Sequence, residues 1–179
     1  MKRFATLVAW IIVVITLASS DLMAQNRSIP VDQRIKQLHE LLAEQWEYSL
    51  KSNPEFASIL GDRRYNDKLS DNSEAAITKD LAQSRSFLKR FEAIDTTGFP
   101  AQEQLNRDLM ILNLRDRVDS AKFKDWEMPV SQFGGIHLDM AQLVTALPFT
   151  TIKDYDDYIA RLKQLPNAFE QIMVLMRKG

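Results

Sequence analysis

The sequence predicts an all-α protein, a multi-helix segment with irregular loops. Two observations carry this prediction. In at least four segments, apolar residues recur at intervals of three and four, as they do on one face of an α-helix. After residue 24, no stretch of more than four residues alternates between apolar and polar side chains as a half-buried strand does, and no internal repeat is present. Residues 25–179 suffice for one domain or for part of a larger one.

Residues 1–24 are predicted to form a cleavable signal peptide. Basic residues precede an unbroken apolar stretch from Phe4 to Ile15, and small residues follow it, so cleavage is expected after Ala24 or after Ser20. The alternative, an uncleaved membrane anchor, is disfavoured because the apolar stretch is shorter than the roughly 20 residues that a bilayer span needs. We therefore expect a periplasmic or secreted protein that has no stable membrane span after cleavage.

The composition excludes several classes of function. The chain contains no cysteine, so it has no disulfide, no thiol nucleophile and no lipid-anchored cysteine. Removal of Lys2, Arg3 and Asp21 with the leader leaves 21 basic and 23 acidic residues, a net charge of −2. Because the charges nearly balance, we expect no binding to nucleic acid or to anionic lipid.

The first half of the mature chain predicts two helices and a loop. A helix from about Val31 to Ser52, with Asp32 as its N-cap, carries an apolar stripe of Ile35, Leu38, Leu42 and Trp46. Asn53-Pro54 ends this helix, and Pro54 starts a short helix that Gly61 closes. The residues from Gly61 to Asn72 show no apolar period and predict a loop, of a length that is often functional.

Two further long helices are predicted next. The first begins at a capping box, Asp71-x-x-Glu74, ends before Thr96-Thr97-Gly98 and carries the stripe Ile77, Leu81, Leu88, Phe91 and Ile94. The second begins at Pro100. Its two apolar rows predict a central helix that packs on two sides; the rows are Leu105, Leu109, Leu112 and Met110, Leu114, Val118.

The last third predicts shorter helices. An irregular connection leads to Gly134-Gly135 and a short helix around Asp139 to Ala146. Thr151-x-x-Asp154 then caps a helix whose Tyr155 and Tyr158 are expected to face the core. After Pro166 an apolar row follows, namely Phe169, Ile172, Met173 and Met176. We expect this row to be uncovered, which predicts self-association through the terminal helix. It also predicts that the natural chain continues past Gly179 or that the reading frame is truncated there.

Three segments resemble those of a known family. They are Gly61-Asp62-Arg63-Arg64-Tyr65-Asn66-Asp67, Gln132-Phe133-Gly134-Gly135-Ile136-His137, and the run from Leu147-Pro148-Phe149-Thr150-Thr151 to Tyr158-Ile159-Ala160-Arg161-Leu162. Over about residues 32–179 the chain resembles the N-terminal part of the bacterial domain of unknown function 885 (DUF885) family. Members of that family resemble zinc metallopeptidases of the gluzincin type. The resemblance implies the N-terminal part of a larger helical metallopeptidase-like fold, zinc as the cofactor of the full-length protein and a peptide as its substrate.

The residues themselves predict no zinc site and no catalytic residue in this chain. A zinc peptidase helix needs two histidines at i and i+4 with a glutamate between them. His39-Glu40-Leu41-Leu42-Ala43 starts in that way but lacks the second histidine, and His137 is far away in the sequence. His39 is therefore interpreted as a surface residue of its helix. The family's metal-binding His-Glu motif is expected in a half that is absent here.

Four residues are candidates for substrate contact: Arg64, Tyr65, Gln132 and His137. The loop that holds Arg64 and Tyr65 gathers donors, acceptors and an aromatic ring, although a structural role with paired arginines is the alternative. His137 follows a glycine doublet whose amides could face a ligand, and its alternative is a turn residue bonded to the backbone. The spacing of the loop carboxylates does not fit an EF-hand, and Asp154, Asp156 and Asp157 are explained by the start of a helix.

Two functions follow from the sequence. The first, which the family resemblance implies, is the N-terminal helical portion of an exported zinc-metallopeptidase-like hydrolase, without the metal motif and inactive alone. The alternative is a noncatalytic exported helical module for binding or interaction.

Overall fold

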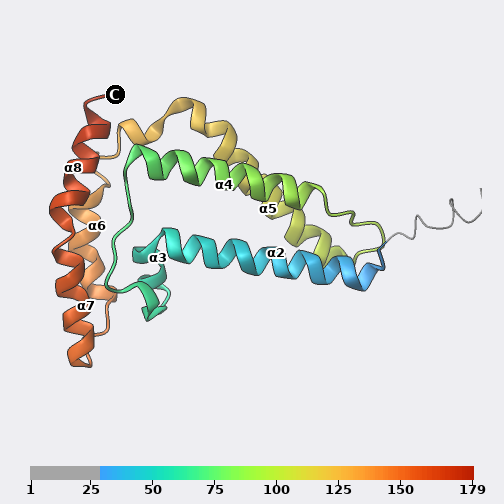
Figure 1. Ribbon diagram of the computed structural model, residues 1–179, viewed down its shortest axis with the longest axis horizontal. Helices are drawn as coiled ribbons and strands as arrows, with labels where there is room; N and C mark the ends of the chain where they lie inside the picture. Colours follow the sequence, from blue (N-terminus) through green and yellow to red (C-terminus); the bar gives the residue numbers. More distant parts are fainter. Residues whose placement is uncertain (1–28) are drawn as a thin grey trace, which may run out of the picture.

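The computed structural model describes residues 29–179, and the predicted signal peptide lies outside them. The described chain is all-α, as predicted, and contains no strand. None of its helices is both long and apolar enough to cross a bilayer. Short 3₁₀ turns join the helices of Figure 1, which are α2 (Val31–Ser52), α3 (Pro54–Ile59), α4 (Glu74–Glu92), α5 (Ala101–Ser120), α6 (Ile136–Leu143), α7 (Ile152–Leu162) and α8 (Leu165–Met176).

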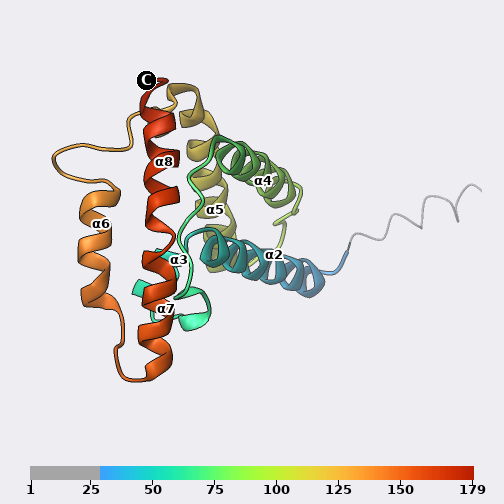
Figure 2. The same ribbon diagram turned by 60° about the vertical axis from the view of Figure 1, so that its left-hand side comes forward.

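The helices form two groups that stand across one another. The long helices α2, α4 and α5 run back and forth as an antiparallel bundle (Figure 1). Helices α7 and α8 follow one another almost in line, and α6 runs in the opposite direction beside them (Figure 2). This second group crosses the bundle at the end where α2 finishes and α4 begins. The loop from Gly61 to Ser73 lies at the junction of the two groups.

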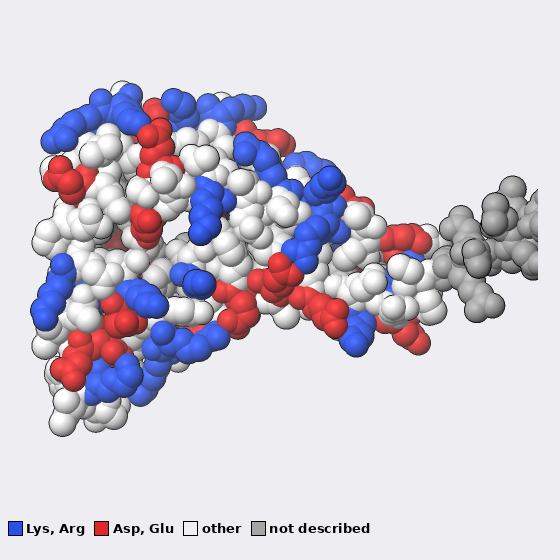
Figure 3. Space-filling view, in the orientation of Figure 1, with Lys and Arg blue, Asp and Glu red and all other residues white. Residues whose placement is uncertain are grey.

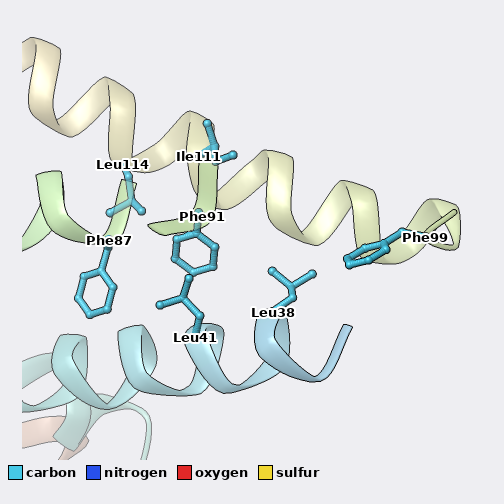
Figure 4. Close-up of a cluster of buried hydrophobic side chains, with 7 residues drawn as sticks. All are labelled: Leu38, Leu41, Phe87, Phe91, Phe99, Ile111 and Leu114. Atoms are coloured by element: carbon cyan, nitrogen blue, oxygen red, sulfur yellow. The ribbon is translucent and has the colours of Figure 1, made fainter. Parts of the chain in front are cut away.

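The main core lies inside the bundle. Its buried side chains meet between the three long helices, and Figure 4 shows the ring of Phe91 between α4 and α2. Burial of each such side chain stabilises the fold by about 1.5–3 kcal/mol before entropy losses. The core comprises Leu38, Leu41, Phe87, Phe91, Phe99, Ile111 and Leu114.

Several sequence predictions hold. Asn53 ends α2 and Pro54 stands in the first turn of α3. Gly61, which follows α3, has a φ of 85°, a conformation that glycine adopts without strain. Thr151 and Asp154 form the reciprocal capping box of α7. The short helix predicted around Asp139 to Ala146 exists but begins earlier, at Ile136.

The helix predicted from about Val31 to Ser52 has these bounds, but two predicted N-cap residues are wrong. Asp32 does not cap α2, because the helix already begins at Val31 and the carbonyl of Pro30 accepts from the amide of Arg34. Asp71 does not cap α4. The hydroxyl of Ser73 takes that place and accepts from the Ala76 amide at 3.2 Å.

Two predicted packing faces are also wrong. Helix α5 does not pack on both sides, because α4 and the core cover only the face of Ile111 and Leu114. The row of Leu105, Leu109 and Leu112 is exposed, to 60% for Leu112. In α7, Tyr155 is exposed and Tyr158 only half-buried, because both rings pack on Phe149 at the surface instead of entering the core.

Candidate functional site

The loop from Gly61 to Ser73 is held in place by a buried arginine of α7. The side chain of Arg161 is 1% exposed. Its Nε donates to the carbonyl of Lys68 at 2.7 Å, and its Nη2 donates to the carbonyl of Tyr65 at 2.9 Å. Nη2 also donates to the hydroxyl of Ser58 in α3 at 2.8 Å. One guanidinium group thus joins α7, α3 and two turns of the loop.

Burial of this guanidinium has a clear electrostatic consequence. Loss of solvent lowers the pKa of Arg161, while the carboxylates of Glu55, Asp67 and Asp157 oppose that shift. Its Nη1 is buried and finds no hydrogen-bond partner in the described part of the chain. A buried charge without full pairing is costly, so this arrangement persists only because the rest of the fold supports it.

Two glutamines extend the same attachment along α7 and α8. Gln164 donates from Nε2 to the carbonyl of Asp67 at 2.6 Å and accepts from the Leu69 amide at 3.2 Å. Gln171 accepts from the amide of Asn72 at 2.9 Å through its side-chain oxygen. Arg161 lies near the end of α7, Gln164 stands just before α8 and Gln171 lies within α8. The loop is therefore bonded along most of its length.

The start of α7 adds a polar contact to this loop. The carboxylate of Asp154 is buried and accepts hydrogen bonds from the amides and hydroxyls of Thr150 and Thr151 at 2.8–3.1 Å. Burial alone raises the pKa of Asp154, but these bonds outweigh it and bring the pKa to about 2. Arg63 of the loop approaches the same carboxylate at 3.5 Å. Asp154 thus remains ionised and fixes the first turn of α7.

A groove of about 570 Å³ lies between α3, α6 and α8 on one side of this loop. We call it the α6–α8 groove. No lysine, arginine or histidine is among the described residues that line it. Its acidic groups are Glu55, whose carboxylate accepts from the amide of Ser70 at 2.9 Å, and Asp139. Its apolar wall comprises Phe56, Ile59, Pro129, Ile136, Met140, Leu143, Ala146 and Ile172.

A second groove, of about 850 Å³, lies on the other side of the loop between α2, α4 and α5. We call it the α2–α4 groove, and the face in Figure 3 is hollowed at this place. Among its charged residues, Asp80 and Arg117 form an ion pair, and Lys51 and Lys79 make no ion pair within the described residues. Burial, together with Asp80, raises the pKa of Tyr48 in its wall. Elsewhere on this face charges of both signs alternate (Figure 3).

Arg64 and Tyr65, two of the predicted contact residues, lie in the loop but line neither groove. Arg64 is exposed and pairs with Glu47 at 2.8 Å and Asp62 at 2.6 Å. Its guanidinium stacks over the ring of Tyr65, 5.4 Å from the ring centre. Paired arginines and a packed tyrosine are what the structural alternative predicts for this loop.

Gln132 and His137, the other two candidates, are exposed, and the structure does not bring them into either groove. Their neighbour Gly135 does line the α6–α8 groove. It has a φ of 131°, and a side chain there would meet the carbonyl oxygen of Pro129 at 3.0 Å. The second glycine of the doublet therefore positions α6 against the groove.

The donor groups of the described chain do not fit a catalytic zinc. Within residues 29–179, no group of three or more His, Cys, Asp or Glu side chains is arranged to hold a metal ion. His39 is exposed on α2 and its Nε2 lies 2.9 Å from a carboxylate oxygen of Glu103. A catalytic zinc needs three protein ligands, so neither histidine belongs to such a set in this part of the chain.

Sequence reasoning did not assign a role to Arg161, Gln164, Gln171 or Asp139. In the sequence, Arg161 stands out only as part of a segment that resembles the family. Its position, three residues after Tyr158 on a helix with apolar neighbours, was the available signal, but the acceptors that require it lie about a hundred residues earlier.

Comparison with known proteins agrees with the sequence resemblance. The model of a family described as "Bacterial protein of unknown function (DUF885)" matches residues 54–179, which is more than half of the chain. The matched range begins at α3 and includes the loop, Arg161 and all the helices after α2, whereas α2 precedes it. Searches of curated proteins and of solved structures gave no significant match.

Proposed function

The chain belongs to the bacterial DUF885 family, and from this premise we propose that it is the N-terminal helical portion of an exported zinc-metallopeptidase-like hydrolase. In this proposal its helices form a wall of the substrate cleft. The gluzincin-like chemistry of the full-length protein rests on the family resemblance. The metal would be held by residues outside 29–179, because the donor groups within that range do not fit a zinc site.

One observation carries the proposal. The loop from Gly61 to Ser73 separates two grooves and is held by side chains of α7 and α8 over most of its length. Ser70 and Asn72 line both grooves. A cleft wall has to keep its shape while a substrate binds, since ordering a loose loop would weaken binding. The buried Arg161 supplies this order before any ligand arrives.

The residues of this chain would then bind and orient a substrate without taking part in bond cleavage. The grooves are the concave surfaces in which a peptide can lie, and their volumes are in the usual range for ligand sites. When bound elsewhere in the full-length protein, zinc would activate water for attack on the substrate.

The experiment that tests the proposal measures metal content and peptide hydrolysis in the same purified sample. We expect less than one zinc per chain by plasma emission spectrometry after dialysis against zinc, and no turnover of a mixed peptide library. One tightly held zinc per chain, with turnover that a chelator abolishes, would refute the assignment of the metal to other residues. The double variant H39A/H137A serves as the matched control for adventitious binding.

The alternative function is a noncatalytic exported module for binding or interaction. One observation favours it, namely that residues of this chain line two grooves, while residues 29–179 contain no group of side chains arranged to hold a metal ion. The two functions differ in one outcome: fusion or co-expression with the metal-bearing part of a family member restores hydrolysis only if this chain is a cleft wall.

Export through the signal peptide is part of the same proposal. The succession of basic, apolar and small residues in positions 1–24 supports it. Expression in a Gram-negative host, followed by fractionation and N-terminal sequencing, should give a periplasmic product that begins at Gln25, or at Asp21 if cleavage follows Ser20. A cytoplasmic product that begins at Met1 would contradict export.

A further inference from the structure

The α6–α8 groove has an unbalanced negative charge. Asp139 lines the groove, and its carboxylate makes no ion pair or hydrogen bond with the described residues. Glu55 is partly compensated, because its carboxylate accepts hydrogen bonds from the amide and the hydroxyl of Ser70. With no basic side chain in the described lining, Asp139 is left as the uncompensated charge of the groove.

The same carboxylate stands within an apolar surface. Ile136 precedes Asp139 by three residues and Leu143 follows it by four, so the three side chains share one face of α6. Met140 lines the groove from the same helix, and Ile172 lines it from α8. A ligand that satisfies both features must carry its positive charge directly beside an apolar group.

We propose that the α6–α8 groove binds the free N-terminus of a peptide whose first residue is apolar. In a peptide N-terminus the α-ammonium group and the first side chain are attached to the same carbon atom, which matches the short separation of Asp139 from the apolar wall. A lysine side chain offers the same charge but at the end of a long stem, away from a second apolar group. That the ligand is a peptide rests on the proposed function; the preference for an ammonium beside an apolar group rests on the lining of the groove.

The groove is open to such a ligand. Asp139 and Gln142 are exposed, and Met140 is half-buried. The amide of Gln142 and the hydroxyl of Thr145 also line the groove and can bond the first peptide unit. A volume of about 570 Å³ is of the size that small ligands occupy.

The test compares two probes with the same side chains, one with a free N-terminus and one with an acetylated N-terminus. Leucyl-leucinamide has a free ammonium group, and N-acetyl-leucyl-leucinamide has the same apolar side chains without the charge. Binding is followed by titration of protein with ¹³C-labelled methionine methyl groups, in which the Met140 signal is assigned by the variant Met140→Leu. We expect the free amine to shift the Met140 signal and to bind about fivefold more tightly than the acetylated probe at low salt, as one contact between exposed unit charges provides.

Variants test whether the preference for the free amine depends on the carboxylate of Asp139. Asp139→Asn should make the two dissociation constants equal, whereas the control Asp119→Asn, at an exposed carboxylate of α5 that lines no groove, should leave the ratio unchanged. Gln142→Lys places an ammonium three residues after Asp139 on an exposed helical face, and it should weaken the free-amine probe alone. Circular dichroism confirms that each variant is folded.

The assignment would be overturned by equal affinity of both probes for the unsubstituted protein, by a preference that survives Asp139→Asn, or by binding that leaves the Met140 signal in place. If N-acetyl-lysinamide binds as tightly as leucyl-leucinamide, the groove takes a lysine side chain and the N-terminal assignment fails. Zinc content and hydrolysis are separate measurements. Equal dissociation constants of the two probes would therefore refute the N-terminal assignment without contradicting the proposed function. Tightly bound zinc with hydrolysis would refute the proposed function without changing the ratio of the two dissociation constants.

Discussion

Replacement of Arg161 by methionine should detach the loop from α7 while keeping the helix and most of the side-chain volume. Arg161 donates hydrogen bonds of 2.7, 2.9 and 2.8 Å to Lys68, Tyr65 and Ser58. Methionine can make none of them, so the carbonyls of Lys68 and Tyr65 lose this donor.

The expected cost follows from these contacts. A hydrogen bond from a charged donor contributes about 1.5–3 kcal/mol, so the three bonds together contribute about 5–9 kcal/mol. The methionine variant no longer has to bury a cation, and the desolvation cost that it avoids offsets several kcal/mol of this loss. The net decrease in the free energy of unfolding is therefore about 3 kcal/mol. For a chain of this size that corresponds to a decrease in Tm of about 6–12 °C.

Urea denaturation followed by circular dichroism measures the decrease, and native-state hydrogen exchange locates it. The amides of Leu69 and Asn72, which bond to Gln164 and Gln171, should lose protection before those of the bundle core. The control is Arg85→Met, at an exposed arginine of α4 without a bonded partner in the described chain, which should change the free energy by less than about 0.5 kcal/mol. Equal effects of the two substitutions, with unchanged exchange in the loop, would refute the role assigned to Arg161.

Three further outcomes are expected. The pKa of Asp154 is about 2 in the folded chain and about 3.8 in the unfolded chain, so the ionised carboxylate stabilises the fold above pH 3.8. The difference in urea midpoint between wild type and Asp154→Asn should therefore shrink as the pH falls from 3.8 to 2, and a constant difference would contradict this. Gly135→Ala should decrease the free energy of unfolding by about 1–3 kcal/mol, because Gly135 has a φ of 131°. In the control Gly134→Ala, the added methyl group would have no atom within 4 Å, so the free energy should change by less than about 0.5 kcal/mol. Thermal denaturation measures both. Self-association through exposed apolar residues of α8 should appear in light scattering and should weaken in the double variant Phe169→Ser/Met173→Gln, whereas a concentration-independent monomer would exclude it.

Helix positions could be predicted because their signals are local. The three-and-four periodicity marks α2, α4 and α5, and the Thr151 capping box marks the start of α7. The cap of α4 is not decided by the local sequence, because Asp71 and Ser73 both carry a side-chain oxygen that can accept from a backbone amide nearby. In the structure Asp71 accepts from the amide of Ser73 and leaves the Ala76 amide to the serine hydroxyl.

The buried face of α5 could not be predicted from its own sequence. Both apolar rows have the same period, so the choice between them depends on where α4 lies, and only the row nearest the core is covered. Trp46 illustrates the same limit, because it continues the stripe of α2 yet is 47% exposed and packs on the ring of Phe56 in α3.

The candidate site was the least predictable part. A buried arginine is indistinguishable in sequence from a surface arginine, and the carbonyls that Arg161 satisfies come from a loop that is distant in the chain. Asp139 gives the same lesson, since its importance arises from the apolar side chains that α3 and α8 bring to its groove. The prediction of a loop from Gly61 to Asn72, with paired arginines as its structural alternative, came closest. Arg64 is indeed paired, but the loop is bonded to α7 by Arg161.

The central claim is that this chain presents a substrate surface that is independent of the metal. Its most direct test is the dissociation constant of leucyl-leucinamide measured twice on the same purified protein, once with a chelator and once with excess zinc, while the probe is monitored for cleavage. The account predicts the same dissociation constant in both conditions and an intact probe throughout. Binding that appears only with zinc, or cleavage of the probe by this chain alone, would contradict it.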